Sequence, residues 1–226
     1  MDNIRNLDEF NTIIKESQNK YEKYKNNLNY KEMHYYNDFK DDTTTLFYIH
    51  GKGSNIEEAL MECKALVGNL KLNFIIPQSK EPYLNNQFCW DDKASAIETL
   101  SSRLEKLETS HFILAGKSQG ARVALDLFCD NKDLNNLMLI MPAIYDNSNI
   151  EEVVQKLKKY SNKRIYIYTG DNDFYRIKVE EFSRILINND INCKIKIIEN
   201  CRHYFPYNEY NDFQEAFKYL LINKGI

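Results

Sequence analysis

Apolar positions follow two different periods along this chain, and the two periods alternate from residue 46 onward. Short apolar runs of strand length lie at 46–49, 72–76, 111–115, 137–141, 165–169 and 193–198, and Pro77 is expected to end the second run. Between and after them, apolar residues recur every three or four positions, as on one face of a helix, at 56–67, 97–107, 121–128, 150–157, 182–186 and 213–221. This alternation predicts an α/β fold, with a mostly parallel central sheet and helices on both faces.

Residues 1–45 lack this alternation and are largely polar. Apolar side chains recur there at roughly helical spacing, at Leu7, Phe10, Ile13, Ile14, Tyr21 and Tyr24. The pattern predicts an amphipathic helix, followed by irregular or β structure over residues 30–39. We therefore divide the chain into an N-terminal extension, 1–45, and a main domain, 46–226. The favoured role of the extension is packing on the main domain; a lid or a dimer contact are the alternatives.

The most informative motif is Gly116-Lys117-Ser118-Gln119-Gly120, which joins a predicted strand to a predicted helix. In this context the G-x-S-x-G spacing is typical of a nucleophile elbow, a sharp turn that holds a serine hydroxyl at the end of a strand. Flanking glycines suit such a turn because the strand and helix backbones pass close together. The alternative, a chance match in a loop, does not explain a strand and a helix on the correct sides.

A serine hydroxyl is a weak nucleophile until a neighbouring base takes its proton. In this architecture the chain order is serine, acid, histidine. Three of the four histidines precede Ser118, so His203 is the one histidine on the correct side. It follows the predicted strand at 193–198, which places it at a strand's C-terminal end. His203 is therefore the predicted base.

The acid is expected between Ser118 and His203, at the end of another strand. The run 165–169 leads into Gly170-Asp171-Asn172-Asp173. Either aspartate would hold the imidazole in its productive tautomer. Asp173 is preferred and Asp171 is the second choice, while Asp146 is a more distant third.

Backbone amides are expected to stabilise the negative charge that develops on the carbonyl oxygen during acyl transfer. One donor should be the amide of Gln119, the residue after the serine. The other should come from His50-Gly51-Lys52-Gly53, after an earlier strand, and is the amide of Lys52 or that of Gly53. His50 itself is interpreted as a structural residue that braces this loop.

Glycine usage supports this grouping of loops. The chain has only seven glycines, and five of them fall in the three loops just described: Gly51, Gly53, Gly116, Gly120 and Gly170. Glycine is needed where a backbone turns sharply or is closely approached. The three loops are therefore predicted to be neighbours in space.

Together these motifs resemble the α/β-hydrolase superfamily. Ser118-Gln119-Gly120 with Phe88-Cys89-Trp90-Asp91 is similar to the phospholipase/carboxylesterase family, which includes acyl-protein thioesterases. The resemblance covers roughly residue 46 to the C-terminus and implies the α/β-hydrolase fold. It also implies a serine esterase or thioesterase, in which the triad and the oxyanion hole are formed by Ser118, Asp173, His203, Lys52 and Gln119.

The sequence departs from the family pattern near the serine. Lys117 stands where an aromatic or small residue is usual, Ala121 replaces a second glycine, and the segment before residue 46 is longer than the family needs. These departures affect the inference about the substrate more than the inference about the reaction. Lys52 and Lys117 adjoin the predicted site. Exposed lysines are common, so the favoured interpretation gives them no role in binding, and the alternative is that they favour a substrate with an anionic group.

Aromatic residues near the predicted site are candidates for substrate binding. The connection 78–92 is the longest in the chain, and it carries Phe88 and the only tryptophan, Trp90. Apolar walls with few polar groups are the usual form of a small-molecule pocket, so these residues would line an acyl-binding groove, which Tyr145 and Tyr204 would extend. The alternative is that Trp90 and Phe88 anchor the loop to the core.

Composition narrows the remaining possibilities. A length of 226 residues suits one domain, and a net charge of −3 gives no indication of a nucleic-acid partner. The five cysteines include no C-x-x-C pair, which argues against structural zinc or a disulfide framework. No apolar run approaches membrane-spanning length.

We expect a cytoplasmic enzyme without metal or organic cofactor, acting on a small-molecule ester or thioester, with a homodimer possible. The alternatives are an acyltransferase and a binding protein on a hydrolase fold.

Overall fold

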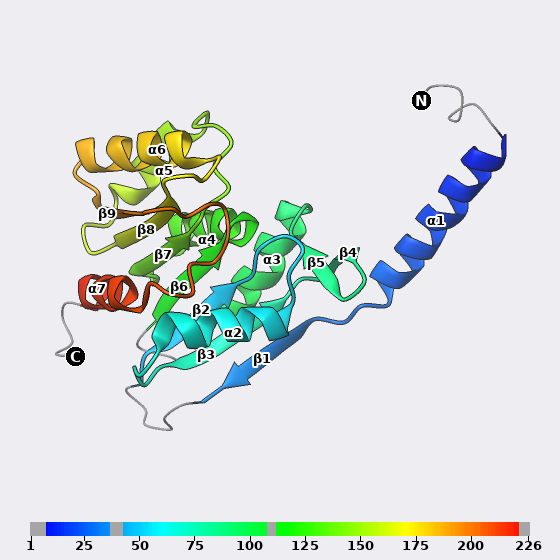
Figure 1. The fold of residues 1–226 in the computed structure, drawn as a ribbon, viewed down its shortest axis with the longest axis horizontal. Coiled ribbons are helices and arrows are strands. Elements are labelled where there is room, and N and C mark those ends of the chain that lie inside the picture. Colours follow the sequence, from blue (N-terminus) through cyan, green and yellow to red (C-terminus); the bar gives the residue numbers. More distant parts are fainter. Residues whose placement is uncertain (1–7, 37–42, 108–111, 222–226) are drawn as a thin grey trace.

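The structure is a computed structural model that describes residues 8–36, 43–107 and 112–221. Within these ranges its centre is a seven-stranded sheet of order β1-β3-β2-β6-β7-β8-β9 (Figure 1). Neighbouring strands are parallel except β1, which runs antiparallel to β3 at the edge. The strands are β1 (Lys31–Tyr35), β2 (Thr45–Ile49), β3 (Asn73–Gln78), β6 (Phe112–Lys117), β7 (Asn136–Ile140), β8 (Arg164–Gly170) and β9 (Asn192–Ile198).

Helices cover both faces of this sheet, and each face has its own apolar core. The helices are α1 (Asp8–Asn26), α2 (Ile56–Val67), α3 (Lys93–Leu104), α4 (Gln119–Asp130), α5 (Ile150–Leu157), α6 (Arg176–Asn188) and α7 (Tyr210–Leu220). Phe47 and Ile49 of β2 join a core with α3 to α6, whereas Leu46 and Tyr48 join a core with α2 and α7. Successive strand residues point to opposite faces, so β2 contributes to both cores. The predicted fold class is confirmed.

The stretch between β3 and α3 differs from the prediction. Pro77 does not end β3, which continues to Gln78. A proline is tolerated there because β2 pairs with β3 only as far as Ile75, and beyond it the strand has β1 alone as a partner. The predicted long loop contains a hairpin, β4 (Glu81–Leu84) and β5 (Gln87–Cys89), whose turn places Asn86 at a positive φ of 52°. Loop 78–92 is therefore a structured element.

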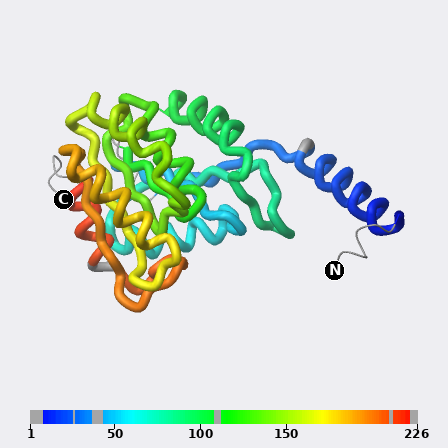
Figure 2. The backbone as a smooth tube through the Cα atoms, turned by 90° about the horizontal axis from the view of Figure 1, so that it is seen from above, coloured from blue at the N-terminus to red at the C-terminus, as the bar shows by residue number. Residues whose placement is uncertain are grey.

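The N-terminal helix does not pack on the main domain as expected. Helix α1 extends away from the sheet (Figures 1 and 2), and most of its side chains are exposed. It reaches the hairpin through Tyr21, whose hydroxyl donates to the Pro82 carbonyl at 3.1 Å. Part of the region expected to be irregular or β forms β1, while residues 37–42 lie outside the described residues. Nowhere in the described chain is there a helix long and apolar enough to span a membrane.

The glycine-bearing loops meet at the carboxyl ends of the strands, as predicted. A β-carbon on Gly120 would overlap the carbonyl oxygen of His50, and one on Gly51 would lie 3.5 Å from the β-carbon of Ser118. Parallel strands that end at one edge bring their following loops together there. The sheet thus places the loops after β2, β6, β8 and β9 around one site.

Candidate active site

Ser118 lies at the turn between β6 and α4, with a left-handed backbone conformation of φ 52° and ψ −116°. This conformation is costly for a residue with a side chain and persists only where the surroundings enforce it. The Ser118 amide donates to the Ile140 carbonyl at 2.9 Å, and the Ser118 carbonyl accepts from the Ala143 amide at 3.1 Å. A β-carbon on Gly116 would overlap the carbonyl of Gly120. The turn has the strained geometry that the motif predicted.

Ser118, His203 and Asp173 form one chain of hydrogen bonds. Nε2 of His203 lies 2.8 Å from Oγ of Ser118, and Nδ1 lies 2.9 Å from Oδ2 of Asp173. Because Nδ1 faces a carboxylate it carries the hydrogen, which leaves Nε2 to accept from the serine hydroxyl. The Asp173 side chain is fully buried, and its other oxygen accepts from the Tyr175 amide at 2.8 Å. The structure therefore brings the three predicted residues together.

The two alternative aspartates lie elsewhere. Asp171 accepts from the amide of Cys201 at 3.1 Å, so it holds the segment that leads to His203. Asp146 is exposed, and its carboxylate accepts from both the hydroxyl and the amide of Ser148, which lowers its pKa. Geometry thus selects Asp173 as the partner of the histidine.

The two predicted amide donors come from the residue after Ser118 and from the loop after β2. The Gln119 amide belongs to the first turn of α4, where backbone N–H groups have no partner inside the helix. In the loop after β2, the Gly53 amide is occupied, because it donates to the Phe88 carbonyl at 2.9 Å. Of the two alternatives in that loop, Lys52 is therefore the better candidate.

His50 fixes the peptide that carries the Lys52 amide. It is fully buried, and burial lowers its pKa to about 4, so the ring is neutral near pH 7. Its Nδ1 lies 2.8 Å from the Gly51 carbonyl and its Nε2 lies 3.3 Å from the Ser79 amide, which requires the tautomer with hydrogen on Nδ1. In a trans peptide the N–H points opposite to the C=O. Holding the Gly51 carbonyl thus orients the N–H of Lys52, and the bracing role expected for His50 is confirmed.

No protein-family model and no curated protein matches this sequence. Among solved structures, an uncharacterised protein from Bacillus cereus ATCC 10987 is similar with a TM-score of 0.72 and 23% identity, over 97% of this chain and 72% of that chain. Esterase PE8 has a TM-score of 0.70 at 16% identity, over 86% of this chain and 100% of its own. Est1E from Butyrivibrio proteoclasticus has a TM-score of 0.64 at 16% identity, over 86% of this chain and 95% of its own. This chain has the α/β-hydrolase fold.

Two lysines beside the serine of this α/β-hydrolase fold are already paired. Lys117 contacts Glu62, which is buried and also accepts from the Tyr48 hydroxyl at 2.7 Å. Lys52 lies 2.7 Å from Asp91. Since each ammonium group has a carboxylate partner, the structure does not support the alternative that these lysines favour an anionic substrate.

The aromatic residues predicted to bind substrate fall into two groups. Trp90 and Phe88 are buried, and the Trp90 indole donates to the His50 carbonyl at 2.8 Å, which is the arrangement expected of loop anchors. Tyr204 and Tyr145 are exposed, with 51% and 57% of their surface accessible. Tyr145 lies on the surface beside Tyr175, with ring centroids 5.1 Å apart.

Two aromatic neighbours of His203 were not among the predicted substrate-binding residues. The ring of Phe174 lies 4.7 Å from that of His203, and the ring of Tyr175 lies 5.1 Å from it. Phe174 is 72% exposed, although it is a large apolar side chain. Both residues directly follow Asp173, so their position beside the acid was the available signal. They give the site an apolar rim at the surface.

Glu81, Cys89 and Asp91 are the one group in the described chain with three potential metal ligands close together, within 4.8 Å of one another. Burial raises the pKa of the Cys89 thiol to about 11, which keeps it protonated near neutral pH, whereas metals bind the thiolate. Asp91 is moreover paired with Lys52. This donor set does not suit a metal ion.

Proposed function

We propose that this protein is a serine hydrolase that cleaves carboxylic esters or thioesters through an acyl-enzyme on Ser118. The observation that carries this proposal is the Ser118–His203–Asp173 chain of hydrogen bonds at a strained turn. The similarity to esterase structures supports an ester substrate. The resemblance of the motifs to the phospholipase/carboxylesterase family supports the inclusion of thioesters.

In the first half of the reaction, His203 Nε2 takes the hydroxyl proton as Oγ of Ser118 attacks the carbonyl carbon. Asp173 stabilises the imidazolium that forms and keeps its orientation. When the tetrahedral intermediate collapses, the bond to the leaving oxygen or sulfur breaks, and His203 donates the proton to that atom. The products of this half are the free alcohol or thiol and an acyl group on Ser118.

In the second half, His203 takes a proton from water as the water oxygen attacks the acyl carbon. The ester bond to Ser118 then breaks, and His203 returns the proton to the serine oxygen, so the enzyme is regenerated and the acid is released. In both halves the negative charge on the carbonyl oxygen is stabilised by the amides of Lys52 and Gln119. Such preorganised donors are usually the largest electrostatic contribution to acyl transfer.

A matched set of substrates tests this function. We would measure turnover of nitrophenyl esters of increasing acyl length and of thioesters with the same acyl groups, using wild type, Ser118→Ala and Ser102→Ala. Ser102 is an exposed serine on α3 and serves as the control. Hydrolysis by wild type and Ser102→Ala, with a loss on the order of 10⁶ in kcat for Ser118→Ala, is the expected result. Equal rates in wild type and Ser118→Ala would refute the proposal.

A further inference from the structure

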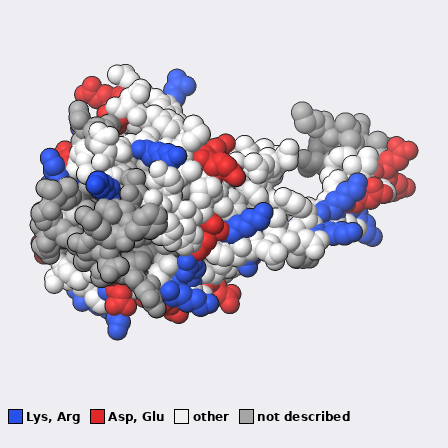
Figure 3. All heavy atoms as spheres, turned by 90° about the horizontal axis from the view of Figure 1, so that it is seen from below, with Lys and Arg blue, Asp and Glu red and all other residues white. Residues whose placement is uncertain are grey.

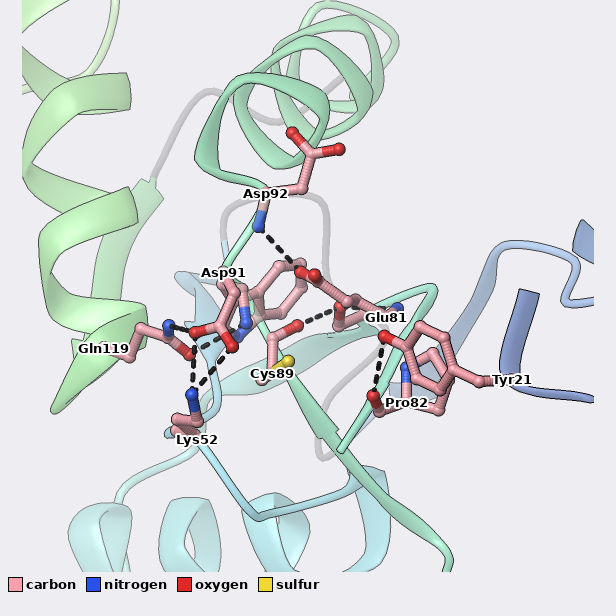
Figure 4. Close-up of polar contacts among 10 residues, drawn as sticks. Tyr21, Lys52, Glu81, Pro82, Cys89, Asp91, Asp92 and Gln119 are labelled. Atoms are coloured by element: carbon pink, nitrogen blue, oxygen red, sulfur yellow. Dashed lines mark hydrogen bonds and ion pairs between the residues drawn. The ribbon is translucent and has the colours of Figure 1, made fainter. Parts of the chain in front are cut away.

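Asp91 lies between two side chains from separate segments, Lys52 of the loop after β2 and Gln119 of α4 (Figure 4). Nζ of Lys52 donates to its Oδ1 at 2.9 Å and to its Oδ2 at 2.7 Å, while Nε2 of Gln119 donates to Oδ1 at 2.6 Å. One carboxylate therefore joins the loop after β2 to the first turn of α4.

Trp90, the neighbour of Asp91, also connects Gln119 of α4 to the loop after β2. The Trp90 amide donates to Oε1 of Gln119 at 2.8 Å, and the Trp90 indole donates to the His50 carbonyl at 2.8 Å. Both ends of the Gln119 side-chain amide are thus bonded to residues 90 and 91. This fixes the direction of that side chain, and with it the position of its backbone.

Lys52 and Gln119 are also the two residues whose backbone amides are the proposed oxyanion donors. Such donors are effective when they are held in position before the reaction, because no reorganisation is then needed. We propose that Asp91 is a positioning residue that sets the separation of the two oxyanion donors by binding both side chains. This inference rests on the proposed function.

Lys52 balances the negative charge of Asp91. A lone carboxylate beside the developing oxyanion would repel it, whereas the Lys52–Asp91 pair is neutral overall. Hydrogen bonding between the partners raises the pKa of Lys52 and lowers that of Asp91, so both stay charged at neutral pH. The pair is well exposed, with 40% and 49% of the two side chains accessible. Exposed pairs contribute little to folding, so the effect of Asp91 is expected on catalysis and not on stability.

Four variants test this inference: Asp91→Ala, Lys52→Met, the double variant, and Asp92→Asn as control. Asp92 caps α3 through a bond from the Ser95 amide to its Oδ1, an acceptor that asparagine retains, so the control removes a neighbouring negative charge without removing the cap. The readouts are kcat, KM, the inhibition constant of a trifluoromethyl ketone that forms a tetrahedral adduct on serine, and Tm.

Asp91→Ala is expected to lower kcat by about tenfold to a hundredfold, somewhat less than loss of a whole donor. KM and Tm should stay unchanged, and the ketone should bind more weakly by the same factor. Lys52→Met should lower kcat more than the double variant does, because it leaves the Asp91 carboxylate without its positively charged partner. Unchanged kcat and ketone binding in Asp91→Ala, or an equal loss of kcat in Asp92→Asn, would overturn the inference. As long as the wild type hydrolyses esters, the proposed function would still stand. An inactive wild type would overturn both.

An independent observation concerns the surface of α1. Phe10, Ile14, Ser17, Tyr21 and Tyr24 are spaced by four and three residues in turn, as in a coiled-coil seam. Ile14, Tyr21 and Tyr24 are 42%, 37% and 50% exposed although the seam is largely apolar. Helix α1 extends away from the sheet (Figure 2). Apart from the Tyr21 hydroxyl, which bonds to Pro82, the exposed side chains of this seam are accessible to another helix.

The charges on α1 are self-complementary. Residues 8–17 hold three acids and one lysine, net −2, whereas residues 18–26 hold three lysines and one acid, net +2. Figure 3 shows acidic side chains toward the outer end of the projecting arm and lysines nearer the body. Antiparallel pairing with a second α1 would place each acidic half on a basic half. Phe10 and Tyr24 are both seven residues from Ser17, so pairing centred on Ser17 would set Phe10 against the partner's Tyr24.

We infer that a second copy of this chain covers α1 by antiparallel pairing. Sedimentation velocity at several micromolar concentrations should show a dimer for wild type and for Asn19→Glu, which adds charge on the opposite side of the helix, but a monomer for Ile14→Glu. Mixing Phe10→Cys with Tyr24→Cys chains should give a mixed disulfide. A monomeric wild type, or disulfides only between identical chains, would overturn the inference.

Discussion

The backbone of Gly170 packs directly against the carbonyl group of Cys201, where a β-carbon would overlap the oxygen. The Asp171 carboxylate accepts the Cys201 amide in the same place, at 3.1 Å. The loop that carries Asp173 is thus joined to the loop that carries His203. We therefore expect the hydrogen bond between Asp173 and His203 to depend on this contact.

Gly170→Ala should therefore separate the two loops. The overlap involves backbone and not a flexible side chain, so it cannot be relieved without moving one loop. We expect kcat to fall by about 10²-fold, the scale of an ångström misplacement, and the free energy of unfolding to fall by about 2 kcal/mol. Ester turnover and urea unfolding of the purified variant measure both effects. An unchanged kcat would show that the two loops hold their positions without this contact.

The two aspartates after β8 should differ sharply. Asp173→Asn is expected to lower kcat by about 10⁴-fold, because the histidine loses the acceptor that sets its tautomer. Asp171→Asn keeps an oxygen that can accept the Cys201 amide, so its loss should be below about tenfold. Comparing kcat for ester hydrolysis decides the assignment, and similar losses in the two variants would contradict it.

His50 should make stability depend on pH. Its pKa is about 4 in the folded protein and about 6.5 when unfolded. Between these values the unfolded chain binds a proton that the folded chain does not, so stability falls as the pH is lowered from 6.5 to 4. The full effect is about 3 kcal/mol. Urea unfolding should show that the free energy of unfolding changes less between pH 7 and pH 4.5 for His50→Gln than for wild type. The same change in both proteins would exclude His50 as the cause.

Phe174 should affect substrate binding more than chemistry. Its exposed ring beside His203 is placed to contact an apolar part of the substrate. We expect Phe174→Ala to raise KM for aromatic and long-chain esters about fivefold, equivalent to about 1 kcal/mol, with little change in kcat. Ile177→Ala, at an exposed position on α6, is the control. A loss confined to kcat would assign Phe174 to the orientation of His203.

The sequence was most informative where structure is local or ordered along the chain. The turn at Ser118 was predictable because the strand, the serine and the helix are contiguous, and His203 followed from chain order. The choice between Asp171 and Asp173 depended on two loops meeting in space. The bridge from Lys52 to Asp91 spans 39 positions and has no local signal. Local sequence does not predict that β3 continues through Pro77, because a proline is tolerated there only when the neighbouring strand does not need its N–H. The separation of α1 from the sheet likewise depends on tertiary contacts that the spacing of apolar residues does not report.

The most direct test of the central claim is the intact mass of the protein after brief exposure to a fluorophosphonate, followed by identification of the modified peptide. The proposed site predicts a single adduct, on Ser118, that is lost in Ser118→Ala and strongly reduced in His203→Ala. An unmodified wild-type protein, or an adduct at another residue, would contradict the account of Ser118 as an activated nucleophile.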